Sequence, residues 1–168
     1  MKKNLLKPMT ALFLASALLF SFISKPERSN FSGEWKLNEG KSDLGQFAGF
    51  ATRTIKTDQK NDSIAIARTA PGFDGNEATS METLTFDGKE KESTLFGNSK
   101  RKATAKWSDD GQTLTFNYTL MLDFDGQVTE VKGVEVWSLT DGGKTLVVQN
   151  NSSSSFGDLA TKSVYEKK

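Results

Sequence analysis

Apolar and polar residues alternate with a period of two over most of the chain beyond residue 30. The stretch 113–124 shows this most clearly, because its even-numbered positions are all apolar or aromatic. Such alternation places successive side chains on opposite faces of a strand, and no segment beyond residue 30 has a helical period. The pattern predicts ten strands, near 33–38, 51–58, 63–69, 81–87, 91–96, 100–108, 113–124, 127–139, 145–152 and 160–167.

Short turn sequences separate these strands. Asp-Gly pairs end at Gly88, Gly111, Gly126 and Gly142, and this pair is a strong hairpin signal because glycine accepts the positive φ of a tight turn. The stretch 70–80, with one proline and two glycines, predicts a longer loop. Strands joined in this way form an antiparallel meander, and closure into a barrel removes its exposed edges. The sequence therefore predicts an all-β, up-and-down antiparallel barrel of 8–10 strands.

The N-terminal residues have the layout of a secretory signal. Three lysines within the first seven residues precede the apolar run 9–23, and the polar segment 25–30 follows. The run is short for a membrane-spanning helix. We therefore expect a signal peptide at 1–29 and a single exported domain at 30–168, in the periplasm or outside the cell. The alternative is an uncleaved N-terminal anchor, which would be the chain's one contact with a membrane.

Charge and composition exclude several functions. Beyond residue 30 the chain has 17 Lys and Arg against 20 Asp and Glu, about −3, whereas the whole chain has +1. This balance argues against nucleic acid, which needs a concentrated basic face. The chain has no histidine and no cysteine, so it lacks the commonest general base, a thiol nucleophile and a histidine ligand for haem.

Asp123 and Asp125 precede Gly126 as in the opening of a calcium loop. No third aspartate precedes the glycine, and no glutamate stands at the closing position. The pair therefore predicts a hairpin turn. We expect no catalytic site, no metal and no cofactor; an enzyme that uses only Asp, Glu, Tyr and Arg is the alternative.

Three arginines are in phase with the apolar faces of their strands. Arg53, Arg68 and Arg101 each lie two residues along the strand from an apolar residue. A buried guanidinium is costly unless it is paired, so an inward arginine needs a carboxylate, a ligand anion or trapped water. Either these arginines form an anion-binding cluster in an apolar cavity, or each lies at a strand end and extends to the rim.

The alternation breaks in one predicted strand, near Gly133. Such a break predicts a β-bulge or a close approach of another group to the backbone. Glu130 and Glu135 flank the break, so the face that each of them occupies stays open.

Both ends of the predicted domain resemble the calycin superfamily. FSGEWKL, at 31–37, resembles the F-x-G-x-W start shared by lipocalins and intracellular fatty-acid-binding proteins. GFATRTI, at 49–55, and the terminal SVYEKK, at 163–168, resemble the fatty-acid-binding branch. WKLN followed by Lys41-Ser42 is similar to small exported lipocalin-like proteins of bacteria, which implies a place in a bacterial cell envelope.

The resemblance implies structural roles at the closed end of the barrel. Trp35, two residues after Gly33, would plug this end, and a basic residue of the last strand would pack across the indole. Lys162 is the nearest candidate for that residue. The family's two-helix lid does not fit between Leu37 and Ala51, so the resemblance implies at most one helical turn or a loop around 44–50.

The resemblance also implies a site for a polar head group. Fatty-acid-binding proteins end with an Arg-x-Tyr pair that grips the ligand carboxylate from inside. Here the sequence reads Ser163-Val164-Tyr165, so the tyrosine is present and the arginine is not. Arg53 or Arg68 would have to substitute from another strand.

The sequence thus predicts an exported barrel that binds a lipid, such as a fatty acid, or another hydrophobic small molecule in its interior. Tyr118, Ser163, Tyr165 and the three arginines would hold the polar head, and Phe116 would contribute to the apolar lining. Each buried methylene would contribute about 0.8 kcal/mol. The alternative is a barrel filled by its 12 phenylalanines that acts through surface protein interactions. A cavity of about 300–1,000 Å³ would favour ligand binding.

Overall fold

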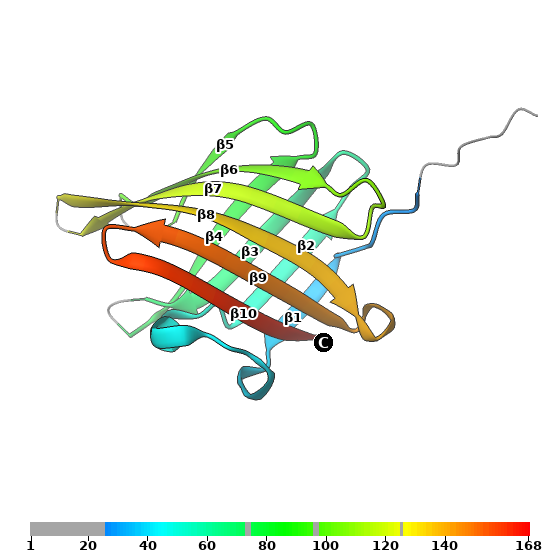
Figure 1. Ribbon diagram of the computed structural model, residues 1–168, viewed down its shortest axis with the longest axis horizontal. Coiled ribbons are helices and arrows are strands. Elements are labelled where there is room, and N and C mark those ends of the chain that lie inside the picture. Colours follow the sequence, from blue (N-terminus) through cyan, green and yellow to red (C-terminus); the bar gives the residue numbers. More distant parts are fainter. Residues whose placement is uncertain (1–25, 73–74, 96–97, 125) are drawn as a thin grey trace, which may run out of the picture.

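The computed structural model describes residues 26–72, 75–95, 98–124 and 126–168, so the apolar run of the expected signal lies outside the described residues. Ten antiparallel strands form one sheet (Figure 1). Among the described residues, no helix has the length and hydropathy that a membrane span requires. The strands are β1 (Gly33–Leu37), β2 (Thr54–Gln59), β3 (Ser63–Pro71), β4 (Glu77–Thr85), β5 (Lys91–Thr94), β6 (Lys100–Trp107), β7 (Thr113–Phe124), β8 (Gln127–Thr140), β9 (Thr145–Ser154) and β10 (Gly157–Lys167).

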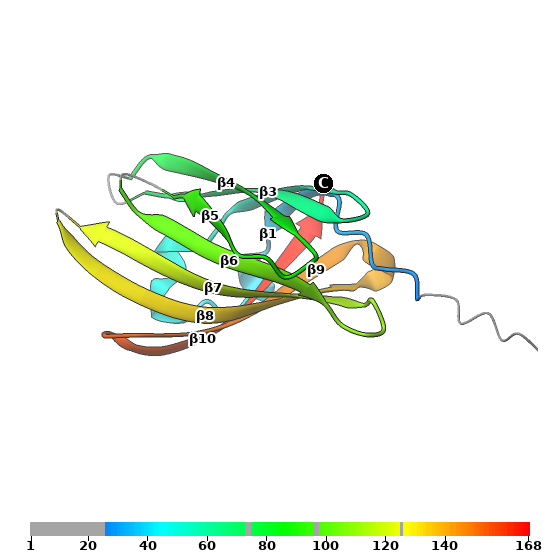
Figure 2. The same cartoon turned by 90° about the horizontal axis from the view of Figure 1, so that it is seen from above.

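The sheet wraps into a nearly closed barrel. Its strand order is β4-β3-β2-β1-β10-β9-β8-β7-β6-β5, so β4 and β5 are the two edges, and they contact each other. Seen from above, β3 and β4 face β7, β8 and β10 across the interior (Figure 2). The predicted up-and-down barrel is confirmed. The loop expected at 70–80 is shorter than predicted, because the β3–β4 ladder extends to the pair Pro71 and Glu77.

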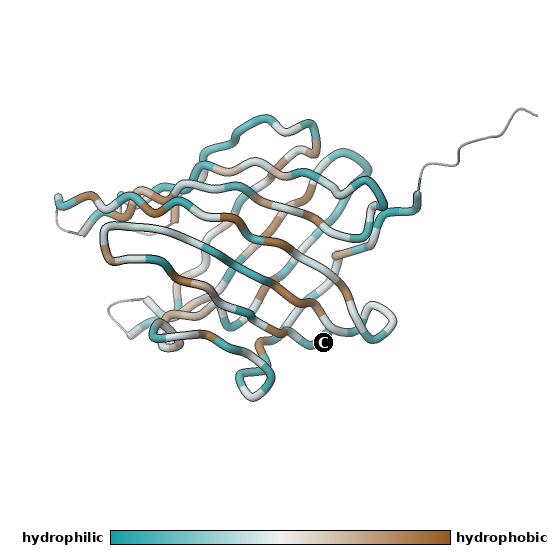
Figure 3. The backbone as a smooth tube through the Cα atoms, in the orientation of Figure 1, coloured by the Kyte–Doolittle hydropathy of each residue, from teal (hydrophilic) through white to brown (hydrophobic). Residues whose placement is uncertain are grey.

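Side-chain alternation fills one end of the barrel with an apolar core. The hydrophobic positions lie within the strands, as Figure 3 shows. We call this end the closed end; it contains the β2–β3, β6–β7 and β8–β9 turns and the end of β10. The core there consists of Phe31, Trp35, Leu37, Ile55, Ile64, Ile66, Leu84, Ala103, Ala105, Trp107, Leu114, Phe116, Trp137, Leu146, Val148 and Tyr165.

The segment before β1 closes this end of the barrel. Phe31 is 0 % exposed. Its ring stacks on Trp107, with centroids 5.6 Å apart, and meets Trp137 edge-on at 5.7 Å. The indole of Trp35 donates a hydrogen bond to the Phe31 carbonyl at 3.0 Å. Phe31 is therefore the centre of an aromatic cluster, since offset and edge-on ring pairs stabilise beyond their buried area.

Arg28 covers the outside of the same cluster. Its guanidinium carbon lies 5.3 Å from the ring centroids of both Phe86 and Trp107, and its Nη1 donates to the Asn61 carbonyl at 2.9 Å. The next residue, Ser29, donates its backbone N–H to a carbonyl of the β6–β7 turn. The residues just before β1 are thus part of the folded domain.

A lysine packs across Trp35, but it is Lys167. The β1–β10 register pairs Trp35 with Lys167, whose Nζ lies 5.1 Å from the indole centroid. A Cβ at Gly33 would come within 2.8 Å of the Lys167 Cε, so the glycine gives this side chain its room. The prediction that Lys162 packs here is wrong. Lys162 lies on the outward face of β10 and forms a backbone bridge with Asp43.

Two short 3-10 helices connect β1 to β2. They are η1 (Glu39–Lys41) and η2 (Gly45–Phe50). The sequence predicts at most one helical turn or a loop around 44–50; the structure has η2 there and the additional short helix η1 before it. Helix η2 lies at the end of the barrel opposite the aromatic core, which we call the open end.

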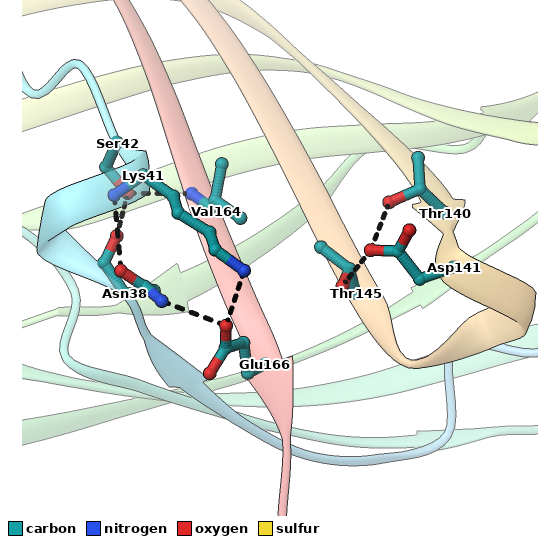
Figure 4. Close-up of polar contacts among 8 residues, drawn as sticks. All are labelled: Asn38, Lys41, Ser42, Thr140, Asp141, Thr145, Val164 and Glu166. Carbon is teal, nitrogen blue, oxygen red and sulfur yellow. Dashed lines mark hydrogen bonds and ion pairs between the residues drawn. The ribbon is translucent and has the colours of Figure 1, made fainter.

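Hydrogen bonds to β10 hold the start of this connection (Figure 4). Ser42 Oγ accepts from the Val164 backbone N–H at 2.9 Å and donates to the Asn38 carbonyl at 2.7 Å. Lys41 Nζ and Asn38 Nδ2 both donate to Glu166 Oε1, at 3.0 and 2.9 Å. The chain therefore continues along β10 beyond the end of β1 and leads to η2 over the open end.

The β8–β9 turn uses the predicted Asp-Gly chemistry. Gly142 and Gly143 have φ values of 64° and 84°, which glycine adopts without strain. Asp141 has a φ of 51°, a left-handed conformation that aspartate tolerates better than most residues. Thr145 Oγ1 donates to Asp141 Oδ2 at 2.7 Å and fixes the aspartate (Figure 4). The expected turn is confirmed.

Candidate functional site

A cavity of about 310 Å³ lies inside the barrel between the aromatic core and η2; we call it the inner cavity. A second hollow of about 260 Å³, the outer cavity, lies beside it toward β3, β4 and β5. Five residues line both: Phe50, Thr52, Arg68, Arg101 and Leu120. The remaining lining of the inner cavity is Leu44, Ala51, Ile55, Tyr118, Glu135, Val148, Asn150, Leu159, Thr161, Ser163 and Tyr165.

Arg68 joins two glutamates across the interior. Its Nη1 forms an ion pair with Glu82 Oε1 on β4, and its Nη2 donates to Glu135 Oε1 on β8 at 2.7 Å. The guanidinium also lies over the Trp137 ring, 5.5 Å from the centroid. Burial disfavours the charged form of Arg68, but the charges of Glu135 and Glu82 outweigh this and raise its pKa. Arg68 is therefore a cation fixed between two carboxylates.

Arg101 extends this network toward the barrel opening. Its Nε lies 3.2 Å from Glu82 Oε2, so this ion pair joins β6 to β4 on the side of the barrel where the edge strands β4 and β5 meet. The guanidinium lies 4.6 Å from the centroid of the Tyr118 ring. Burial and the like charge of Arg68 lower the pKa of Arg101 from its ordinary value. We call Arg68, Glu82, Arg101 and Glu135 together the charge cluster.

The charge cluster is buried, balanced and incompletely hydrogen-bonded. The exposed fractions of its four side chains are between 6 and 13 %. Two positive and two negative charges leave no net charge. Within the described part of the chain, Arg101 Nε, Arg101 Nη2 and Glu82 Oε2 are buried and have no hydrogen-bond partner. Such atoms are costly in an interior unless another group satisfies them.

The two tyrosines of the cavity bond to the protein itself. Tyr118 Oη donates to Asn150 Oδ1 at 2.7 Å, and Tyr165 Oη donates to the Thr52 carbonyl at 3.1 Å. Burial is the main cause that raises the pKa of each hydroxyl. Both tyrosines are therefore neutral at physiological pH, and each hydroxyl proton is already used in a hydrogen bond to the protein.

Tyr118 occupies the space that Gly133 leaves free. A Cβ on Gly133 would come within 2.4 Å of the Tyr118 Cζ and Oη. The strand β8 pairs continuously with both neighbours here, so the irregularity is a close approach and not a bulge. Glu135 continues the inward face toward Trp137, whereas Glu130 lies exposed on the outer face.

Comparisons with known proteins identify the architecture. No protein-family model matches the chain, and no curated protein matches it. The crystal structure of zebrafish ileal bile acid-binding protein complexed with cholic acid is similar, with a TM-score of 0.51. The alignment covers 82 % of this chain and 98 % of that chain at 16 % sequence identity. The fold is that of the fatty-acid-binding-protein barrels.

Most of the predicted site residues meet in the interior of this fatty-acid-binding-protein-like barrel. Five of them line the inner cavity: Arg68, Arg101, Tyr118, Ser163 and Tyr165. Arg53 does not; its side chain is 32 % exposed and forms an ion pair with Glu39, as the alternative of a rim position predicts. Phe116 is also outside the lining, because it is buried in the core against Trp137, with ring centroids 5.0 Å apart.

The sequence interpretation missed the carboxylates that pair with the arginines. Glu82 lies two residues before the buried Leu84, and Glu135 lies two residues before the buried Trp137. A charged residue two positions from an inward apolar residue is the signal that identified the three arginines. The same signal identifies Glu82 and Glu135 when it is applied to acidic residues. The signal for Glu135 was obscured because Val134 and Val136 are apolar but point outward from β8.

A larger depression of about 760 Å³ lies on the sheet over β6 to β10. Its lining consists largely of small polar side chains and includes the exposed Lys102, Lys132 and Asp158. None of the buried atoms without a hydrogen-bond partner belongs to a residue that lines it. The inner cavity is therefore the candidate site of this fatty-acid-binding-protein-like barrel.

Proposed function

We propose that the protein binds a hydrophobic small molecule in the inner cavity. The observation that carries this proposal is a cavity of about 310 Å³ whose lining combines apolar side chains with Arg68, Arg101 and Glu135, and in which two buried Arg101 nitrogens have no hydrogen bond. This volume lies at the lower end of the range of about 300–1,000 Å³ that is typical of ligand sites. It favours a small guest and argues against the alternative of a filled barrel.

The lining fits an amphipathic guest. Leu44, Ile55, Leu120, Val148 and Leu159 offer apolar contacts, which stabilise a bound hydrocarbon by about 0.8 kcal/mol for each buried methylene. The charge cluster would meet the polar end of the guest. The similarity to a barrel solved with cholic acid, an amphipathic molecule, supports an amphipathic guest here.

We also propose that the domain is exported, on the basis of the lysines and apolar run within 1–23. Because Arg28 and Phe31 contact the barrel, we place the cleavage site before Arg28. Export would present the barrel to guests in the cell envelope. N-terminal sequencing of the mature protein should therefore find a chain that begins after the apolar run 9–23 and no later than residue 28; a chain that begins at Met1 would show an uncleaved anchor.

Filling the inner cavity should abolish binding. Ser163→Phe places a ring among the lining residues, whereas Ser153→Phe places the same ring on the outer face of β9. We expect the first variant to bind Nile red, an uncharged hydrophobic dye, at least about tenfold more weakly than the wild type, and the second to bind it normally. Fluorescence titration measures both. Equal affinity in the two variants would place the dye outside the barrel and contradict the proposal.

A further inference from the structure

We propose that the polar group of the guest is an uncharged donor and acceptor, a hydroxyl or a primary amide, and not a carboxylate. This inference rests on the proposed function and specifies the ligand class of the same site. It follows from the charge balance and the hydrogen-bonding state of the charge cluster.

In the described part of the barrel, the charge cluster contains as many anions as cations. Arg68 and Arg101 are neutralised by Glu82 and Glu135, all within a network whose side chains are at most 13 % exposed. A ligand carboxylate would add a third negative charge to this buried group. A buried charge without a partner of its own is strongly unfavourable, so an anionic head group would weaken binding.

A group that both donates and accepts would satisfy the atoms of the cluster that have no hydrogen bond. Arg101 Nε and Nη2 are donors without a hydrogen-bond partner among the described residues, and Glu82 Oε2 is an acceptor without one. Glu82 Oε2 lies 3.2 Å from Arg101 Nε. Arg101 lines both cavities and Glu82 lines the outer one. A hydroxyl or primary amide placed where the two cavities meet can accept from the guanidinium and donate to the carboxylate. A ligand carboxylate can only accept, and it would lie beside the like charge of Glu82.

The tyrosines do not restore a carboxylate site. Tyr165 Oη donates to the Thr52 carbonyl, and Tyr118 Oη donates to Asn150 Oδ1, so neither proton is free for an anion. Ser163 stands two residues before Tyr165, where an arginine would have supplied a third cation. Arg68 and Arg101, the two cations in the described lining of the inner cavity, pair with Glu135 in the same lining and with Glu82 in the lining of the outer cavity. The charge cluster therefore has no cation in excess of its own carboxylates.

Three probes with the same hydrocarbon chain test the inference. Dodecanol, dodecanamide and dodecanoate are titrated at neutral pH against the wild-type protein with bound Nile red. We expect the alcohol and the amide to bind at least about tenfold more tightly than dodecanoate. Dodecanoate binding as tightly as the other two, or displacement of the dye by none of the three, would overturn the inference and leave the proposed function standing. Failure of the dye and of all three probes to bind would overturn both.

A change of cavity charge gives a second test. Glu82→Gln leaves one cation in excess, so it should bind dodecanoate at least about tenfold more tightly than the wild type does. Glu92→Gln is the matched control, because Glu92 is an exposed residue of β5 that pairs with Lys100. If Glu82→Gln does not fold, the wild-type comparison decides alone. A folded Glu82→Gln that binds dodecanoate no better than the wild type would contradict the inference.

Discussion

Replacement of Arg68 with methionine should lower the free energy of unfolding by about 3–5 kcal/mol at neutral pH. Arg68 is the cation between Glu82 and Glu135, and its loss leaves two carboxylates in the interior with too little positive charge. Urea unfolding followed by tryptophan fluorescence measures the change. Arg53→Met is the control, because the Arg53–Glu39 pair lies at the rim and an exposed ion pair contributes at most about 1 kcal/mol.

The same variant should respond to acid in the opposite direction from the wild type. Burial opposes the ionisation of Glu135, but Arg68 and Arg101 outweigh it, so the pKa of Glu135 lies below its ordinary value of 4.5. In the wild type this group stabilises the fold above pH 4.5, and the contribution is lost as the pH falls through the lowered pKa. In Arg68→Met the carboxylate lacks its main cation, so protonation between about pH 7 and pH 4 should restore stability. The account of the charge cluster would be contradicted if Arg68→Met were as stable as Arg53→Met and its stability changed with acid as that of the wild type does.

Replacement of Phe31 with alanine should cost about 3–5 kcal/mol of unfolding free energy. Phe31 is fully buried between Trp107 and Trp137 although it precedes the first strand. Its removal leaves a cavity in the aromatic cluster that closes the barrel. Phe156→Ala should change stability by no more than about 0.5 kcal/mol, because Phe156 lies 72 % exposed between β9 and β10. Thermal or urea unfolding of both variants makes the comparison, and similar losses would show that the segment before β1 does not close the barrel.

The fold could be predicted from sequence because its determinants are local. Period-two alternation defined all ten strands, and β7, from Thr113 to Phe124, was predicted to the residue. Asp-Gly pairs such as Asp141-Gly142 marked the turns because their positive φ is a property of the backbone. The short connection between Leu37 and Ala51 left room for η2 and no larger lid.

The candidate site could be predicted only in part, because pairing depends on register between distant strands. The phase of the apolar alternation identified Arg68 and Arg101 as inward residues. The carboxylates that pair with Arg68 lie far from it in sequence, Glu82 by 14 positions and Glu135 by 67. The alternation phase also predicts an inward Arg53. At the open end of the barrel, however, the Arg53 side chain reaches solvent and pairs with Glu39.

Register also decided which lysine covers Trp35. The resemblance to lipocalins suggests Lys162, but the side chain of Lys162 points to the opposite face of β10 from that of Tyr165. Lys167 is in phase with Tyr165 and stands directly opposite Trp35 in the β1–β10 ladder. The alternation rule, applied to β10 alone, would have favoured Lys167.

Native mass spectrometry of the protein purified from its own cells, without detergent, tests most directly whether the barrel holds a guest. The account predicts one small non-covalent molecule per chain, released by collisional activation and absent from Ser163→Phe but retained by Ser153→Phe. Bare chain mass in the wild type, or an adduct that persists unchanged in Ser163→Phe, would contradict it.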